Sequence, residues 1–393
     1  MAKIIPFKAV RPTRDKVSLI AARSYDTYTP EQREARLRDN PFSFLHIVNP
    51  GYKYSQVTNG KKRYKLVRNR YQEFKEDEIF MQEETPSFYI YKIVNRDGHE
   101  FNGIIAAAST EDYEQDLIKK HEDTLEYKEK TFVKYLKTVG FNAEPVLLTY
   151  PDHEGLDSLI TTVMQTRAEY EFTTTYKDTH YLWPVSESDL ISKISEAFSS
   201  MPNIYIADGH HRSSSSFLLS KKLQKENEQH TGDEAYNYFM SYLIPESDLK
   251  IYEFNRLIKD LNGHNKDEFL IQLDERFRIE NRGQNFYKPS KKHHFSMYLD
   301  GDFYSLYLRK DYYQINNALD ALDTHILFKL VLDPILGIKD VRNDTRIEYA
   351  DGKKDMAFVK TAVDTQDFAV GFGMLPVTTE EMKQIADLSL IHI

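Results

Sequence analysis

IYIADGHHRSSSS, residues Ile204 to Ser216, is the stretch of this sequence that says most about the fold. The short apolar run Asn203 to Ala207 has the β-branched and aromatic composition of a buried strand. Gly209 permits a tight turn with a positive φ angle, and a helix is expected to follow as far as about Glu226. The stretch therefore predicts a strand–turn–helix unit with polar side chains at the turn.

The side chains at this turn are those of a phosphate site. Backbone N–H groups at a helix N-terminus, together with His210, His211 and Arg212, form a cradle for phosphate, and Ser213 follows them. Asp208 would lie at the opening of this cradle, where it can hold a metal ion or a hydroxyl nucleophile. The alternative is that Asp208 only caps the helix while the other side chains are solvated. A zinc site made of the two adjacent histidines is disfavoured, because neighbouring helix residues point in different directions.

A second polar cluster, IKKHEDT, occupies residues 118 to 124. Lys120 and His121 offer cations for phosphate, and Glu122 offers a carboxylate that can take a proton from an alcohol. The alternative is an ordinary charged helix boundary, with Thr124 or the residue before it as the N-cap. Taken alone, the cluster favours that alternative.

Composition limits the chemistry and the partners. The chain has 393 residues, with 52 Lys and Arg against 61 Asp and Glu, and a formal charge of −9. Long-range electrostatics therefore disfavour nucleic acid and anionic membranes as partners. Because the chain has no cysteine, disulfides, thiol nucleophiles, iron–sulfur clusters and cysteine-built zinc sites are excluded. Chemistry must use His, carboxylates, hydroxyls, Lys or Arg.

Missing motifs narrow the protein class further. Neither G-x-x-x-x-G-K-[ST] nor G-x-G-x-x-G occurs, so the loops of P-loop and dinucleotide-binding enzymes are absent. The longest apolar run, Gly103 to Ala108, is far shorter than the roughly 20 residues that a membrane-spanning helix needs. Prolines interrupt the N-terminal region before a signal-peptide core can form. We therefore expect a cytoplasmic protein without flavin, haem or NAD.

Short β-rich runs alternate with amphipathic stretches and no repeat is found, which indicates an α/β to α+β fold. A hairpin is expected from Ser87 to Ala107, a helix over Pro30 to Arg38 with Thr29 as N-cap, and a charged helix over Arg70 to Gln82. Phe42 to Val48 has the composition of a buried strand.

Weak seams near residues 150 and 230 suggest three regions. Residues 1–150 would carry the His-Glu motif, residues 151–230 the DGHHR unit that completes the core, and residues 231–393 a C-terminal α+β region.

Several motifs together resemble one family, domain of unknown function 1015. In chain order, the matching segments are P-F-K-A-x-R-P (Pro6–Pro12), N-P-x-S-F-L (Asn40–Leu45), P-S-F-Y-I-Y (Pro86–Tyr91), I-K-x-H-E-x-T (Ile118–Thr124), L-W (Leu182–Trp183), Y-I-A-D-G-H-H-R (Tyr205–Arg212) and I-x-Y-A-D-G (Ile347–Gly352). The sequence departs from the family where Ser213 to Ser216 stand in place of an aromatic residue, and it lacks the usual M-P-P-K-S-T stretch.

A weaker resemblance concerns the free-serine kinases of the ParB/sulfiredoxin fold, in which a His-Glu pair precedes D-G-H-H-R at a distance. This resemblance implies a ParB/sulfiredoxin-like core, with Glu122 as the base and Asp208 orienting the hydroxyl or holding Mg²⁺. It also implies a set of phosphate and substrate ligands: Lys120, His121, Thr124, Gly209, His210, His211, Arg212 and Ser213.

The functional hypothesis that follows is a Mg²⁺-dependent small-molecule phosphotransferase. It would convert free L-serine to O-phosphoserine, with ADP, ATP or pyrophosphate as donor. Two alternatives remain open: a ParB-like regulator that senses a nucleotide without turning it over, and a phosphohydrolase whose Glu base activates water. The partners implied are a small-molecule substrate and a phosphate donor, and the sequence does not reveal the oligomeric state.

Overall fold

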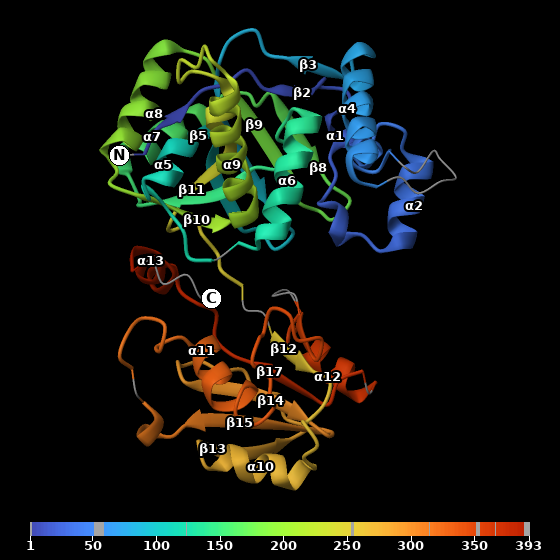
Figure 1. Cartoon of the computed structure of the whole chain (residues 1–393), viewed down its shortest axis with the longest axis vertical. Helices are drawn as coiled ribbons and strands as arrows, with labels where there is room; N and C mark the ends of the chain where they lie inside the picture. Colours follow the sequence, from blue (N-terminus) through green and yellow to red (C-terminus); the bar gives the residue numbers. More distant parts are fainter. Residues whose placement is uncertain are drawn as a thin grey trace. The chain divides into compact units, whose positions relative to one another are not determined.

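The computed structural model describes residues 2–50, 59–122, 124–252, 255–313, 315–350, 354–365 and 367–388. The chain forms two compact units, Met1–Leu249 and Lys250–Ile393, each with its own principal sheet and hydrophobic core (Figure 1). The α/β to α+β class expected from the sequence is confirmed.

A mixed nine-stranded sheet organises the first unit, in the order β6-β10-β7-β11-β5-β4-β9-β8, with β1 added beside β5. Its strands are β1 (Ile4–Ile5), β4 (Phe88–Val94), β5 (Glu100–Ser109), β6 (Ile118–Lys119), β7 (Val146–Tyr150), β8 (Tyr170–Thr173), β9 (Thr179–Val185), β10 (Ile204–Asp208) and β11 (Tyr238–Pro245). β10 runs parallel to β6 and antiparallel to β7. A small separate sheet pairs β2 (Val10–Pro12) with β3 (Phe80–Gln82).

Helices pack against this sheet and against one another. They are α1 (Val17–Ile20), α2 (Pro30–Asp39), α3 (Leu45–Val48), α4 (Gly60–Glu76), α5 (Thr110–Glu114), α6 (Glu126–Val139), α7 (Glu154–Met164), α8 (Ser188–Ser200) and α9 (His210–Glu226), with 3₁₀ turns at Tyr25–Thr27 and Ala235–Asn237. α6 and α9 lie side by side (Figure 1). Ile204 and Ile206 of β10 belong to the same buried core as Phe198 of α8, which anchors the strand that leads into α9.

An antiparallel six-stranded sheet organises the second unit, in the order β13-β15-β14-β17-β12-β16. Its elements are β12 (Asn255–Ile258), α10 (Lys266–Asp274), β13 (Phe277–Gly283), β14 (His294–Leu299), β15 (Asp302–Leu308), a 3₁₀ turn (Lys310–Tyr312), α11 (Asp323–Leu327) with a π-helical turn (Phe328–Leu332), β16 (Ile347–Ala350), α12 (Met356–Asp364), β17 (Val370–Gly373) and α13 (Thr379–Asp387). Aromatic and aliphatic side chains from both faces of the sheet are buried in two clusters.

The predicted elements are confirmed where the sequence carries a clear turn or helix-capping signal. β4 and β5 form the expected hairpin, and Gly98 takes a φ of 80° at its turn. α2 begins at Pro30 behind Thr29, whose side chain forms a capping box with Gln32. The DGHHR segment joins β10 to α9 as a strand–turn–helix unit.

Two sequence predictions are wrong. Phe42 to Val48 forms no strand: it ends in α3, because its apolar residues also match helical i, i+3 spacing and short buried runs do not distinguish the two structures. The charged helix expected over Arg70 to Gln82 is α4, which begins at Gly60 and ends at Glu76. Glu78, with a φ of 54°, turns the chain into β3.

Other expectations are met only in part. The helix expected over Ala318 to Leu332 begins only at Asp323. Lys250 to Tyr252 form no strand, and the last two residues of the strand expected there lie outside the described residues. Asp351 and Gly352 of the I-x-Y-A-D-G motif, and Asp123 of the cluster at 118 to 124, also lie outside them.

The seams expected near residues 150 and 230 both fall inside the first unit, which extends to Leu249. β7 and β11 lie on either side of the intervening segment and pair in parallel, from Ser241 opposite Val146 to Pro245 opposite Tyr150. Because the same sheet contains strands from before, between and after the two seams, these positions are loops within one unit.

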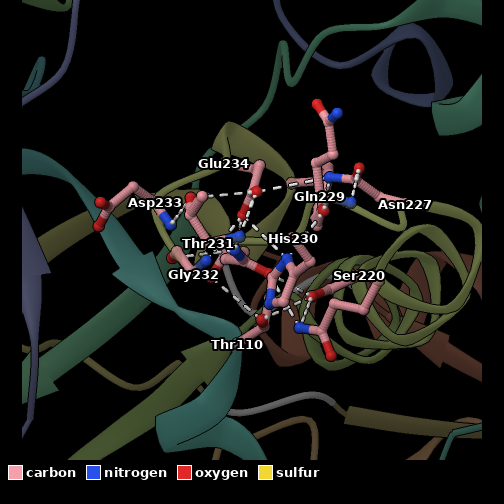
Figure 2. Close-up of polar contacts among 12 residues, drawn as sticks. Thr110, Ser220, Asn227, Gln229, His230, Thr231, Gly232, Asp233 and Glu234 are labelled. Atoms are coloured by element: carbon pink, nitrogen blue, oxygen red, sulfur yellow. Dashed lines mark hydrogen bonds and ion pairs between the residues drawn. The ribbon is translucent and has the colours of Figure 1, made fainter.

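The loop between α9 and β11 is organised by the carboxylate of Glu234, as Figure 2 shows. Glu234 accepts hydrogen bonds from the backbone N–H of Thr231 at 2.7 Å and of Gly232 at 3.0 Å, and it pairs with Nδ1 of His230 at 2.9 Å. These hydrogen bonds, those from the Thr231 backbone foremost, lower the pKa of Glu234 to about 2. The loop is therefore held by an ionised side chain.

Replacing Glu234 with glutamine is expected to remove a pH-dependent part of the free energy of unfolding. Because the pKa in the folded state lies below the ordinary 4.5, the carboxylate stabilises the fold above pH 4.5, and this contribution is lost as the pH falls through about 2. The check is the urea midpoint of both proteins between pH 6 and pH 2, with Glu228→Gln in the same loop as control. The gap between wild type and Glu234→Gln should close toward pH 2, and a constant gap would contradict this account.

Candidate functional site

The parallel pairing of β6 with β10 brings the two polar motifs of the sequence together. Ile204 lies opposite Ile118 and Tyr205 opposite Lys119, so the carboxyl ends of both strands reach the same edge of the sheet. The His-Glu pair begins two residues after the end of β6, and the DGHHR segment begins at the last residue of β10. In open α/β sheets this edge is where ligands bind.

His121, Glu122 and His210 meet at that edge. Nδ1 of His210 lies 3.5 Å from Oε2 of Glu122, and the backbone N–H of His121 points at Nε2 of His210 at 3.5 Å. The two imidazole rings stand edge to face, with their centroids 4.5 Å apart. One ligand atom from each of the three side chains falls within 4.8 Å of the others. The two motifs thus form one cluster, which we call the His-Glu-His cluster.

Both imidazoles of the cluster are buried, and burial decides their charge. His121 is 8% exposed and His210 is 5% exposed. Burial lowers the pKa of His121 to about 4. It lowers the pKa of His210 to about 3, with the neighbouring imidazoles of His121 and His211 adding to the effect. Both rings are therefore neutral at pH 7, which differs from the cationic role expected of His121.

Gly209 and Arg212 shape the turn itself. Gly209 has a φ of 100°, in the left-handed region, and a Cβ atom there would lie 3.1 Å from Nε of Arg212. The Arg212 guanidinium folds over this glycine, with Nη2 2.5 Å from Oδ2 of Asp208 and Nη1 donating to the carbonyl of Pro145. Asp208 and the Pro145 carbonyl together hold Arg212 in place at the turn.

The N-terminus of α9 has a glycine as its N-cap. Gly209 has no side chain that could accept a hydrogen bond, and the first turn of α9 contains no acidic residue. The alternative in which Asp208 caps the helix is therefore not realised. The N–H groups at a helix N-terminus, at the positive end of the helix dipole, suit an anion. With Arg212 beside it, this end of α9 can hold a phosphate group.

Lys120 lies near the same edge of the sheet, but its ammonium group already contacts neighbouring residues. Its ammonium group lies 4.5 Å from the centre of the Tyr113 ring, donates to the Tyr113 carbonyl at 3.4 Å and stands 3.9 Å from Asp116. Its flexible stem leaves the charge available to a nearby anion.

The hydroxyl groups of Thr124 and Ser213 form hydrogen bonds away from the His-Glu-His cluster. Thr124 donates to Oε1 of Glu129 at 2.5 Å, an acceptor that it shares with Ser214. Ser213 is fully buried and donates to the carbonyl of His210 at 3.0 Å. The Thr124 hydroxyl thus links the segment before α6 to Glu129 of α6, whereas the Ser213 hydroxyl bonds within the start of α9.

The serine run is explained by close packing of α9. Ser213 to Ser216 and Ser220 are all buried. Ser215 and Ser216 donate to carbonyls of the preceding turn, at 2.6 Å and 2.8 Å, so they carry no unpaired hydroxyl into the interior.

Glu129, which joins α6 to α9 through Ser214, was not anticipated from the sequence. In the sequence it is one of several acidic residues of an amphipathic helix.

Comparisons with known proteins identify the family. Residues 4–325 match the family model described as "Protein of unknown function (DUF1015)", as the sequence motifs implied. No curated protein matches.

Solved structures that resemble the chain include SbnI with a C-terminal truncation from Staphylococcus aureus, with a TM-score of 0.36 and 12% identity over 72% of this chain and 78% of that one. A free serine kinase in complex with AMP matches with a TM-score of 0.35 and 11% identity, over 74% of this chain and 83% of the kinase. A conserved hypothetical protein from Pyrococcus furiosus gives a TM-score of 0.32 and 12% identity, over 73% and 84% of the two chains. Within the described residues, no helix has the length and apolar character needed to cross a membrane.

Proposed function

The chain belongs to the DUF1015 family, and from this premise we propose that it is a phosphotransferase acting on the hydroxyl of a small metabolite, most specifically free L-serine. One observation carries the proposal. The parallel register of β6 and β10 puts a carboxylate, Glu122, beside His210 at the N-terminus of α9, the helix that also carries Arg212 in its first turn. A proton acceptor next to an anion site is what transfer of a phosphoryl group to an alcohol requires.

Glu122 is the general base in this proposal. Its side chain is 48% exposed, so a substrate hydroxyl can reach it. The hydroxyl oxygen attacks the phosphorus atom, the bond between phosphorus and the leaving oxygen of the donor breaks, and the hydroxyl proton passes to Glu122. The products are the phosphorylated alcohol and the shortened donor.

The turn and the start of α9 stabilise the transferred group. The N–H groups at the helix N-terminus and the guanidinium of Arg212 face the charge that develops on the phosphoryl oxygens. Asp208 acts through Arg212 as a positioning residue. Because the imidazoles of His121 and His210 are neutral at pH 7, they contribute hydrogen bonds, and Lys120 and Arg212 contribute the positive charge.

Magnesium would enter with the donor. Mg²⁺ takes few protein carboxylates and keeps phosphate and water oxygens as its other ligands, and the exposed carboxylate of Asp208 can offer it one oxygen. The ion would neutralise the charge of the donor phosphates. ADP, ATP and pyrophosphate all present such phosphates, and the site sets no preference among them.

Phosphorus NMR tests the proposal. The protein is incubated with Mg²⁺ and L-serine, and separately with ADP, ATP or pyrophosphate as donor. We expect O-phosphoserine with at least one donor. Free phosphate that forms independently of serine would favour a phosphohydrolase, whereas donor binding without turnover would favour a nucleotide-sensing regulator. Either of these results, without phosphoserine from any donor, refutes the kinase proposal.

Replacing Gly209 with alanine is expected to weaken binding of the donor as well as the fold. The left-handed φ of 100° costs a non-glycine residue roughly 1–2 kcal/mol of unfolding free energy, and the new Cβ meets the Arg212 guanidinium. Gly140→Ala is the matched control, because Gly140 has a φ of 80° but nothing within 4 Å of an added Cβ.

Urea unfolding and calorimetric titration with pyrophosphate separate the two effects of Gly209→Ala. Both variants should lose stability, Gly209→Ala by at least as much as Gly140→Ala, but only Gly209→Ala should bind pyrophosphate more weakly. Equal affinities in the two variants would show that Arg212 does not contact the phosphate.

A further inference from the structure

We propose that His121, Glu122 and His210 form a binding site for a divalent transition-metal ion of the Zn²⁺ type. The inference goes beyond the proposed phosphotransferase activity, because it concerns the resting protein and holds whether or not a phosphoryl group is transferred. It also differs from the Mg²⁺ expected at Asp208, which lies outside the His-Glu-His cluster and would enter with the donor.

The donor set selects the class of ion. Two imidazole nitrogens and one carboxylate oxygen suit Zn²⁺ and its transition-metal neighbours, whereas Mg²⁺ prefers an all-oxygen shell. Three protein ligands leave at least one coordination position for water or for an oxygen of a bound molecule, as in catalytic zinc sites. The open position would lie beside the N-terminus of α9, which begins with His210.

The distances in the cluster are close to those of a coordinated ion. Two ligand atoms bound to one tetrahedral Zn²⁺, each about 2.1 Å away, are separated by about 3.4 Å. Nδ1 of His210 and Oε2 of Glu122 are already 3.5 Å apart, and the whole set lies within 4.8 Å. A shift of the exposed Glu122 side chain and a small rotation of the His121 ring are sufficient to close the site.

The buried ring of His121 supplies a second, independent observation. His121 is 8% exposed, and its Nδ1 atom has no hydrogen-bond partner among the residues that the structure describes. Buried polar atoms are nearly always paired, so an unpaired one on a residue of the His-Glu-His cluster points to a bound group.

Metal binding requires a change of tautomer at His210. Because Nε2 of His210 faces the backbone N–H of His121, the neutral ring carries its proton on Nδ1, toward Glu122. A metal ion at Nδ1 requires the proton to move to Nε2, which gives up the hydrogen bond with the His121 backbone. That bond is 3.5 Å long, beyond the usual range for N–H donors, but two N–H groups would then face each other, so the His210 ring must turn away from the His121 backbone when the ion binds.

The test is titration of the full chain, freed of metal with a chelator, with Zn²⁺ alone. Isothermal calorimetry measures affinity and stoichiometry, and Co²⁺ absorption reports whether imidazole and carboxylate surround the ion. We expect one Zn²⁺ per chain and no comparable binding of Mg²⁺. His121→Asn, His210→Asn and Glu122→Gln should each weaken Zn²⁺ binding by at least about tenfold. His211→Asn, which changes a histidine beside the cluster, should bind Zn²⁺ as the wild type does.

Unchanged Zn²⁺ affinity in Glu122→Gln and His210→Asn, or a stoichiometry far below one, would overturn the inference. Circular dichroism checks that the histidine variants fold, and Glu122→Gln keeps the test decisive because its exposed side chain is dispensable for the core. The titration contains neither serine nor a phosphate donor. Phosphoserine formation without Zn²⁺ binding would therefore refute only this inference, and Zn²⁺ binding without phosphoserine would refute only the proposed function.

Discussion

Replacing Glu122 with glutamine is expected to lower the rate of phosphoserine formation by about 10²–10⁴-fold, the usual contribution of a general base. The amide matches the carboxylate in size but cannot accept the hydroxyl proton. Because the side chain is 48% exposed and lies outside the hydrophobic core, the variant should unfold at the wild-type temperature. Initial rates by phosphorus NMR, together with thermal unfolding, measure both quantities.

Glu126→Gln is the matched control for the base. Glu126 is an exposed carboxylate in the first turn of α6, paired with Lys130, and its removal should leave the rate of phosphoserine formation unchanged. Should Glu122→Gln keep a rate within threefold of the wild type, Glu122 is not the base and the assignment of the His-Glu motif is wrong.

Replacing Asp208 with asparagine is expected to lower the same rate by about 10²-fold, the size of effect that follows from misplacing a catalytic group by about 1 Å. Asparagine cannot form the ion pair that holds Nη2 of Arg212 2.5 Å from Oδ2 of Asp208. The guanidinium then loses its orientation over Gly209 and, with it, its position for the phosphate.

The control for Asp208 is a second carboxylate near the same guanidinium. Oε2 of Glu144 is 3.8 Å from Nη1 of Arg212, and the Glu144 side chain is 56% exposed, so Glu144→Gln should change the rate little. If the two variants lost activity equally, the effect would come from net charge near Arg212 and not from the Asp208 ion pair.

The strand–turn–helix unit at residues 204–226 could be predicted because its signals are local. An apolar run, a glycine at the position that needs a positive φ, and a following helix occur in immediate succession. The hairpin of β4 and β5 and the capped start of α2 follow from local signals in the same way. The resemblance to free-serine kinases then predicted that the His-Glu pair and the DGHHR turn belong to one site.

The geometry of the site could not be predicted, because it depends on contacts between distant parts of the chain. β6 has only two residues, too few for a periodic pattern, so its parallel pairing with β10 leaves no trace in the local sequence. The burial that makes His121 and His210 neutral depends on the same packing. The polar composition of the cluster led to the opposite expectation, a cationic cradle.

Local sequence patterns also could not predict the boundary between the two units. Gly, Pro and charged residues near 150 and 230 mark loops as well as domain ends, and only the pairing of β7 with β11 shows that these segments belong to one sheet. The division after Leu249 is set by the contacts within each unit.

The most direct measurement of the central claim, that Glu122 and the start of α9 form one phosphoryl-transfer site, is a crystal structure of Glu122→Gln with L-serine and ADP bound. We predict that the terminal phosphate lies within hydrogen-bond distance of the N–H groups of His210 and His211 and of the Arg212 guanidinium. The serine hydroxyl should lie about 3 Å from the side chain at position 122. A donor phosphate bound away from the N-terminus of α9, or a serine hydroxyl out of reach of position 122, would contradict the account.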